Sequence, residues 1–259
     1  MIGLIMGMIG GGGSILGVPV LVYVNGIESQ SATTYSLFII GITSLIGAIT
    51  YLRNGEISGE AILQFAIASV VSVFCTRKFI LPAFPETIHV FGSLITKNSI
   101  ILILFAVLML SSAYNMIKKR KPNLASDTKW LEFSRSPFGI PFIVLLGLLV
   151  GLLTGFVGAG GGFIIVPVLM SFMKLKFKKA IGTSLTIIAL NSLVGFTGNI
   201  KDQVIDWQLL GILSAISIVG ILIGSMLSKK VSSKKLKPAF GWFTLIVGIS
   251  VLTKELFFK

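Results

Sequence analysis

The chain has 259 residues, of which 54% are apolar and only 12% are charged, and its mean hydropathy is +0.97. These values exclude a soluble domain and indicate an integral membrane protein embedded in a lipid bilayer. The net charge of +13 does not indicate a nucleic-acid-binding protein, because there is no soluble domain or basic arm to hold one. The single cysteine, Cys75, cannot form a disulfide within the chain and is expected to be a packing residue.

The apolar residues gather in segments long enough for membrane helices, and a polar stretch divides these segments into two sets. They are expected at 2–24, 32–52, 59–81 and 99–117, and then at 137–173, 180–200, 207–228 and 238–253. Residues 1–117 are interpreted as a first transmembrane repeat, 118–136 as a basic cytoplasmic linker and 137–259 as a second transmembrane repeat. Met1 leads straight into apolar residues, so no cleaved presequence is expected.

The second half of the chain is a copy of the first. With a constant offset of 148 residues, residues 3–57 match the second half without a gap at nineteen positions. The matches include Gly10 with Gly158 and Ser36 with Ser184, which apolar composition alone does not produce. The sequence therefore predicts an internal repeat.

The basic residues predict how the two copies are oriented. Fifteen of the 22 Lys and Arg residues lie in 118–135, 174–179 and 229–237, which the positive-inside rule places in the cytoplasm. The 37-residue run 137–173 must then leave the cytoplasm and return to it. At 1.5 Å per residue it is about 55 Å long, too long for one crossing and too short for two. It is expected to form a re-entrant hairpin of two short helices, broken at Pro141 and at the glycine cluster. With three further crossings in each repeat, the copies are inverted.

Each hairpin is expected to turn at a run of glycines deep in the membrane. The helices that follow, starting near Ser14 and Gly162, would point their N-termini at each other, and free amides at helix N-termini bind anions. Broken helices in inverted repeats are the pattern of secondary transporters. Hydroxyl groups near the start of the next helix would add donors. The predicted substrate site comprises Gly11, Gly12, Gly13, Ser14, Thr34, Ser36, Gly160, Gly161, Gly162, Thr183 and Ser184.

Simpler interpretations of the same residues stay open. Glycines spaced by four, namely Gly3, Gly7, Gly151 and Gly155, are interpreted mainly as helix-packing positions. Hydroxyl groups, including those of Ser44 and Ser192, equally well bond carbonyls of their own helix.

Charged and metal-ligating residues give no sign of another kind of site. No formal charge falls in the middle of an apolar segment, so the anion is expected to be held without a buried Arg or Lys. No pair of carboxylates, cysteines or histidines is present, so no metal, cofactor or enzyme active site is expected. His89 is expected in a solvated loop between residues 82 and 97.

Two related motifs carry a family resemblance. They read Gly-Gly-Gly-Gly-Ser-Ile-Leu-Gly-Val-Pro-Val-Leu from Gly10 and Gly-Ala-Gly-Gly-Gly-Phe-Ile-Ile-Val-Pro-Val-Leu from Gly158, each followed by Ala-x-x-x-Ser-Leu. Together they resemble the TauE/SafE family of sulfite exporters, over essentially the whole chain. The resemblance implies a multi-pass permease of the bacterial inner membrane for sulfite, sulfoacetate or other organosulfonates, driven by the proton gradient, with Gly10–Ser14 and Gly158–Gly162 at the central site.

The sequence thus favours a secondary transporter that exports a small sulfur oxyanion or sulfonate by alternating access. A passive anion channel with the same site is one alternative. Another is a non-transport membrane subunit of a sulfur pathway, which a reactive role for Cys75 would favour. The choice of anion, the coupling ion and the presence of a homodimer stay open.

Overall fold

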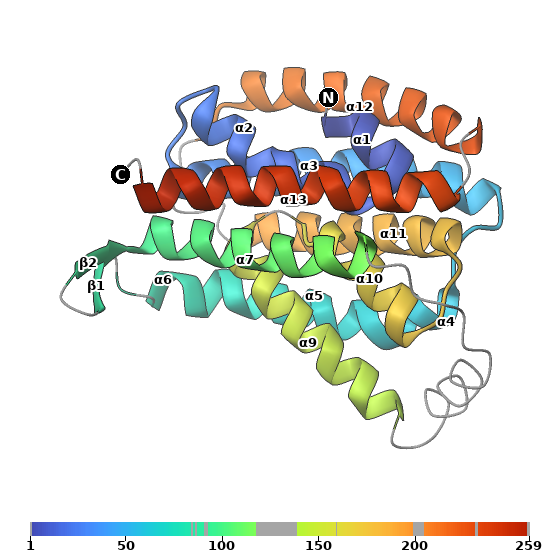
Figure 1. Ribbon diagram of the computed structural model, residues 1–259, viewed down its shortest axis with the longest axis horizontal. Coiled ribbons are helices and arrows are strands. Elements are labelled where there is room, and N and C mark those ends of the chain that lie inside the picture. The colour runs from blue at the N-terminus through green and yellow to red at the C-terminus, as the bar shows by residue number, and fades with distance from the viewer. Residues whose placement is uncertain are drawn as a thin grey trace.

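The computed structural model describes residues 2–83, 85, 87–90, 93–117, 139–158, 160–198, 205–230 and 233–257. Their secondary-structure elements are helices apart from one pair of short strands (Figure 1). The first repeat contains α1 (Ile2–Ile9), the 3-10 helix η1 (Gly11–Leu16), α2 (Gly17–Tyr23) and α3 (Ser29–Arg53). One helix with two π-helical stretches follows, as α4 (Gly59–Ala61), η2 (Ile62–Ala66), α5 (Ile67–Cys75), η3 (Thr76–Ile80) and α6 (Leu81–Ala83). Then come β1 (Thr87–Val90), β2 (Ser93–Thr96) and α7 (Lys97–Ile117). The second repeat contains α9 (Gly139–Val157), α10 (Gly162–Phe172), α11 (Phe177–Thr197), α12 (Trp207–Lys230) and α13 (Ser233–Phe257).

Within the described residues, five helices are long and apolar enough to cross a membrane. They are Ser31–Arg53, Gly59–Ala83, Gly139–Val157, Phe177–Thr197 and Trp207–Ser228. Large apolar side chains such as Leu63 and Ile246, 67% and 62% exposed, point away from the bundle, as a lipid-facing surface requires. The prediction of an all-α, multi-pass membrane protein is confirmed.

Three local expectations are wrong. Pro141 does not break α9, because it stands in the first helical turn, where a missing N–H loses no partner. The first arm of the second hairpin is therefore a 19-residue helix, about 28 Å long, that runs obliquely to its neighbours (Figure 1). His89 lies in β1, opposite Leu94 of the antiparallel strand β2, rather than in a loop.

Both hairpins are broken at glycines. In the second repeat, Gly158, Gly160 and Gly161 have φ angles of 68°, 64° and 72°, which side chains other than glycine rarely adopt, and α10 begins at Gly162 as expected. In the first repeat the break is at Gly10, with a φ of 77°. The chain then continues as η1, so the return arm starts at Gly11 in a 3-10 helix, earlier than the predicted start near Ser14.

The helices pack in pairs, and the 148-residue offset relates each pair to an equivalent pair. Helix α1 packs along α12, and its counterpart α9 packs along α5, the counterpart of α12. Helix α3 packs against its own counterpart α11, and α7 against α13. A pseudo-two-fold axis between α3 and α11, as the predicted inverted repeats require, would produce this pattern of packing.

Helices α3 and α11 run antiparallel. Gly41 of α3 lies beside Leu193, near the end of α11, whereas Tyr51, near the end of α3, lies beside Gly182, near the start of α11. Antiparallel packing of two equivalent helices is what the hypothesis of inverted repeats requires.

The helix ends that flank the three basic segments gather at one end of the bundle. Tyr51 marks this end, because it lies beside Gly182 of α11 and shares a hydrogen bond with Ser228 of α12. Helix α9 starts at the same end, because its Gly147 lies beside Phe65 and its Gly151 beside Ser69, so it runs in the same direction as the helix Gly59–Ala83, which begins shortly after Tyr51. We call this the basic end. The predicted linker 118–136 lies outside the described residues.

The glycines spaced by four lie where helices approach closely. A Cβ atom on Gly3 or Gly7 would collide with backbone atoms of α12, and one on Gly151 would collide with the carbonyl oxygen of Ser69. At Gly155 it would meet the side chain of Thr76. Their interpretation as packing positions is confirmed.

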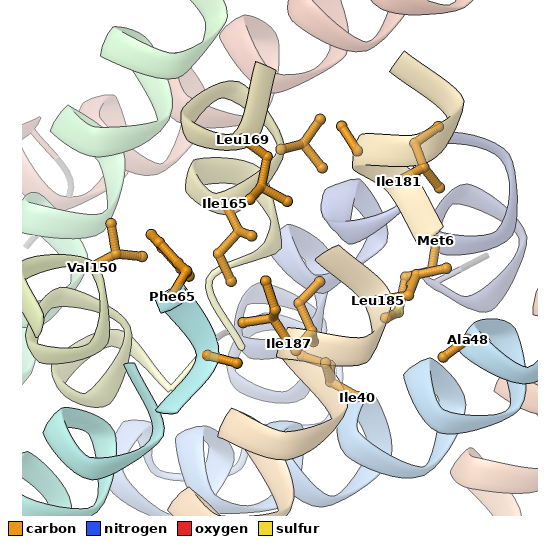
Figure 2. Close-up of a cluster of buried hydrophobic side chains, with 14 of the residues drawn as sticks. Met6, Ile40, Ala48, Phe65, Val150, Ile165, Leu169, Ile181, Leu185 and Ile187 are labelled. Carbon is orange, nitrogen blue, oxygen red and sulfur yellow. The ribbon is translucent and has the colours of Figure 1, made fainter. Parts of the chain in front are cut away.

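The apolar core fills the space between the hairpins and the central helices. Figure 2 shows its buried side chains, with Ile40 from α3, Ile165 and Leu169 from α10, and Leu185 and Ile187 from α11. Because both repeats contribute to one core, neither hairpin can move without changing its contacts to the other repeat.

Candidate functional site

The return arms of the two hairpins meet at the centre of the bundle. The 3-10 helix η1 packs against α10. Ile40, near the middle of α3, touches both hairpins, because it lies beside Gly17 at the start of α2 and beside Gly160 at the second break. The chain thus brings the two predicted glycine clusters into one region.

Two buried serines face the backbone of the hairpins. The Ser36 hydroxyl lies against Gly17, and the Ser192 hydroxyl lies against Gly160. Within the described part of the chain neither hydroxyl has a hydrogen-bond partner, and the same holds for Ser44. Buried hydroxyls rarely stay unpaired, so these groups are available to a ligand or to water.

Other hydroxyls follow the simpler interpretation. Ser184 donates to the carbonyl of Ile181 at 2.8 Å, and Thr43 donates to the carbonyl of Ile39 at 2.6 Å, each on its own helix. Ser184 is therefore satisfied without a ligand. Among the predicted glycines, Gly13 packs on α1 and Gly161 packs on Thr154, at positions related by the repeat.

Thr34 and Thr183 are not brought together. Each stands near the start of its helix, and because α3 and α11 run antiparallel, the two residues lie at opposite ends of the bundle. The predicted donors therefore form two groups, with the centre between them. Gly11, Gly12 and Ser14 lie in η1, and Ser14 is buried.

Near each end of the bundle, one hydrogen bond joins the two halves of the chain. At the basic end, the N–H of Ser58 donates to Oγ1 of Thr183 at 2.9 Å. At the other end, the N–H of Asp206 donates to the hydroxyl of Tyr35 at 2.8 Å. The offset of 148 relates Ser58 to Asp206 and Tyr35 to Thr183, so the two bonds are equivalent in the two halves. We call them the two clasp bonds.

Arg77 is the site residue that the sequence analysis missed. It lies in the π-helical turn η3 and is 0% exposed, although the sequence placed it at the end of an apolar segment. Its Nη1 donates to Oγ1 of Thr33 at 3.2 Å, while Nε and Nη2 have no hydrogen-bond partner among the residues that the structure describes. Nη2 lies directly against Gly158, and Gly198 covers the Cβ atom. The expectation that the site lacks a buried cation is wrong.

The interactions around Arg77 do not compensate its burial. Removing an ion from water costs several kcal/mol, which includes the loss of water hydrogen bonds by its unpaired donors. In return, a hydrogen bond from a charged group contributes about 1.5–3 kcal/mol. The C-terminal end of α9, next to Gly158, adds about 0.3–2 kcal/mol. No carboxylate pairs with Arg77 within the described part of the chain. A buried cation of this kind marks a functional site in a membrane protein.

The repeat contained a signal for this burial. The offset pairs Arg77 with Ser225, which falls inside the predicted segment 207–228. By analogy with Ser225, position 77 was to be expected inside a helix and not at its end. The π-helical geometry around it is common at functional sites.

The cation belongs to one half of the site only. At the equivalent position of the other repeat, Ser225 donates to the carbonyl of Leu222 on its own helix. Thr33 is replaced there by Ile181, which packs on Gly10. The charged half lies toward the end opposite the basic end, because Thr33 stands near the start of α3.

The fold and the site define the class of protein. Helices broken inside the bundle, in two related halves that enclose a buried charge, form the architecture of a membrane transporter.

Comparison with known proteins identifies the family. Residues 1–251 match the model of the sulfite exporter TauE/SafE family, and the chain belongs to this family. It is therefore a membrane permease of the TauE/SafE type, which is not an enzyme class and which in bacteria resides in the inner membrane.

Several curated relatives carry the same general description. A probable membrane transporter protein of Xylella fastidiosa is 25% identical over 98% of this chain and 92% of its own length. One from Methanocaldococcus jannaschii is 25% identical over 97% and 93%. The probable membrane transporter protein YjnA of Bacillus subtilis is 26% identical over 97% and 96%. No solved structure is significantly similar to the chain.

Proposed function

We propose that this protein is a secondary transporter that exports a small sulfur-containing anion, such as sulfite, sulfoacetate or another organosulfonate, by alternating access. The observation that carries this proposal is the pair of equivalent clasp bonds, one at each end of the bundle. A channel needs no such pair, whereas a transporter must close one end while the other is open.

The substrate path runs along the interface of α3 and α11, between the two hairpins. Ile40, in contact with both hairpins, blocks this path at the centre in the closed arrangement. Rocking of one repeat against the other, with the repeats inverted in the membrane, breaks one clasp bond at a time and exposes the central hydroxyls of Ser36 and Ser192 to one side.

The proton gradient is the proposed driving force. The carboxylate of Asp206 is already engaged, because its Oδ1 accepts from the N–H of Leu209 and caps α12. We therefore expect the proton to enter through another group or with the anion itself.

Flux in proteoliposomes tests the proposal. Vesicles loaded with unlabelled sulfite should take up labelled sulfite in a saturable counterflow, and an imposed pH gradient should change the net rate. Gly160→Val should abolish flux, because its side chain would enter the space of Ser192 and Ile40. Gly211→Val is the matched control, since Gly211 faces open space on α12. Unsaturable flux without counterflow would instead identify a passive channel.

A further inference from the structure

We propose that Arg77 binds the transported anion directly, and that Arg77, Thr33 and Gly158 form a one-sided oxyanion site. This inference rests on the proposed function, because it names the residue that selects the substrate. Three observations carry it: the burial of Arg77, the identity of its unpartnered atoms and the absence of a side chain at Gly158.

The unpartnered atoms define the geometry of the ligand. Nε and Nη2 form one edge of the guanidinium plane, and their N–H groups point in parallel. Such an edge matches two oxygens bonded to one central atom, as in a sulfonate, sulfite or carboxylate. A spherical anion such as chloride can satisfy only part of this edge.

Thr33 and Gly158 hold the guanidinium in place. Nη1, on the opposite edge, donates to Thr33, which fixes the plane and leaves the Nε and Nη2 edge available. A Cβ atom on Gly158 would collide with Nη2 and with Thr33. The glycine therefore provides the space that this end of the guanidinium occupies, in addition to its left-handed turn.

The site is specific to the second hairpin. At Gly10, the equivalent glycine, the nearest atoms to a Cβ atom belong to Ile181, where Gly158 has Arg77 and Thr33. The anion thus binds at one charged position on the side of the bundle opposite the basic end, and passes the central serines by weaker interactions.

Anion binding to purified protein tests the site. The unfolding temperature and the Kd should be measured with sodium methanesulfonate and sodium sulfite, against sodium chloride at equal ionic strength. Both oxyanions should raise the unfolding temperature of the wild-type protein more than chloride does. Arg77→Gln should weaken oxyanion binding at least tenfold. Arg77→Lys should weaken it less, because lysine keeps the positive charge but lacks the two parallel N–H groups of arginine. Lys78→Gln, the exposed neighbour of the same charge, should bind as wild type.

A pair of glycine variants gives a second measurement that does not remove the arginine. Gly158→Ala and Gly26→Ala both place a side chain at a positive φ angle, 68° and 67°, but a Cβ atom on Gly26 meets nothing within 4 Å. Only Gly158→Ala should lose oxyanion binding, by tenfold or more, while Gly26→Ala keeps it.

The outcomes separate this site from the proposed function. If wild type binds and transports oxyanions but folded Arg77→Gln binds them equally well, the Arg77 site is wrong and the transporter proposal stands. Equal loss of binding in Gly158→Ala and Gly26→Ala would also reject the site. If wild type neither binds nor transports any oxyanion, the proposed function is wrong as well.

Discussion

The two clasp bonds allow a sharp test of alternating access, because they are equivalent by sequence and lie at opposite ends of the bundle. Tyr35→Phe removes the acceptor for the Asp206 N–H, and Thr183→Val removes the acceptor for the Ser58 N–H. A partly buried donor that loses its acceptor costs about 1–2 kcal/mol in the closed arrangement. Because about 1.4 kcal/mol corresponds to a factor of ten, each variant should shift the population of open states roughly 5- to 30-fold, in opposite directions.

Cysteine labelling can measure this shift. Ser36→Cys, in a Cys75→Ser background, places one buried thiol beside the hairpin of the first repeat. An impermeant maleimide added from the end opposite the basic end should label this thiol faster in the Tyr35→Phe variant and more slowly in the Thr183→Val variant. Equal changes in both variants, or no change in either, would refute the assignment of the clasp bonds as gates.

Three further predictions concern packing, chemistry and topology. Gly224→Leu should lower the unfolding temperature strongly, because the new side chain would meet the backbone of α1 at an overpacking cost of about 1–3 kcal/mol or more. Gly211→Leu on the same helix should be neutral or slightly stabilising. Cys75→Ser should leave anion flux unchanged, and loss of flux would favour a reactive thiol in a sulfur pathway. Thiols placed at Asn25 and Lys176, both exposed, should be labelled from opposite sides of the membrane, with Lys176→Cys accessible only from the cytoplasm; labelling from one side would contradict inverted repeats.

Single glycines have two different roles in this chain, and their spacing in the sequence indicated which role each has. Gly7 and Gly155 lie at helix crossings, whereas Gly10 and Gly158 turn the chain at positive φ angles. Both roles favour glycine for lack of a Cβ atom, and the spacing by four indicated the first role only because helix geometry repeats at that interval. Gly10 contacts Ile181 whereas Gly158 contacts Arg77, and this difference depends on the neighbouring helices.

The sequence by itself determined the features that local physics controls. Backbone groups in lipid must bond within their own segment, so apolar length predicted helices such as 29–53 and 207–230 to within a few residues. Glycine runs predicted where the helices break, and the offset of 148 predicted the pairs of equivalent helices. These properties depend on residues close together in the chain.

Tertiary structure decided where the polar groups lie relative to one another. Arg77 stands next to exposed Lys78 and near Pro82, so its sequence neighbours indicated a helix end. Its burial depends on Thr33 and Gly158, which lie 44 and 81 residues away along the chain. Antiparallel packing of α3 and α11 likewise separated Thr34 from Thr183. Contacts between distant segments determine the desolvation and pairing of a charge, so only the folded chain shows that the candidate anion site contains a cation.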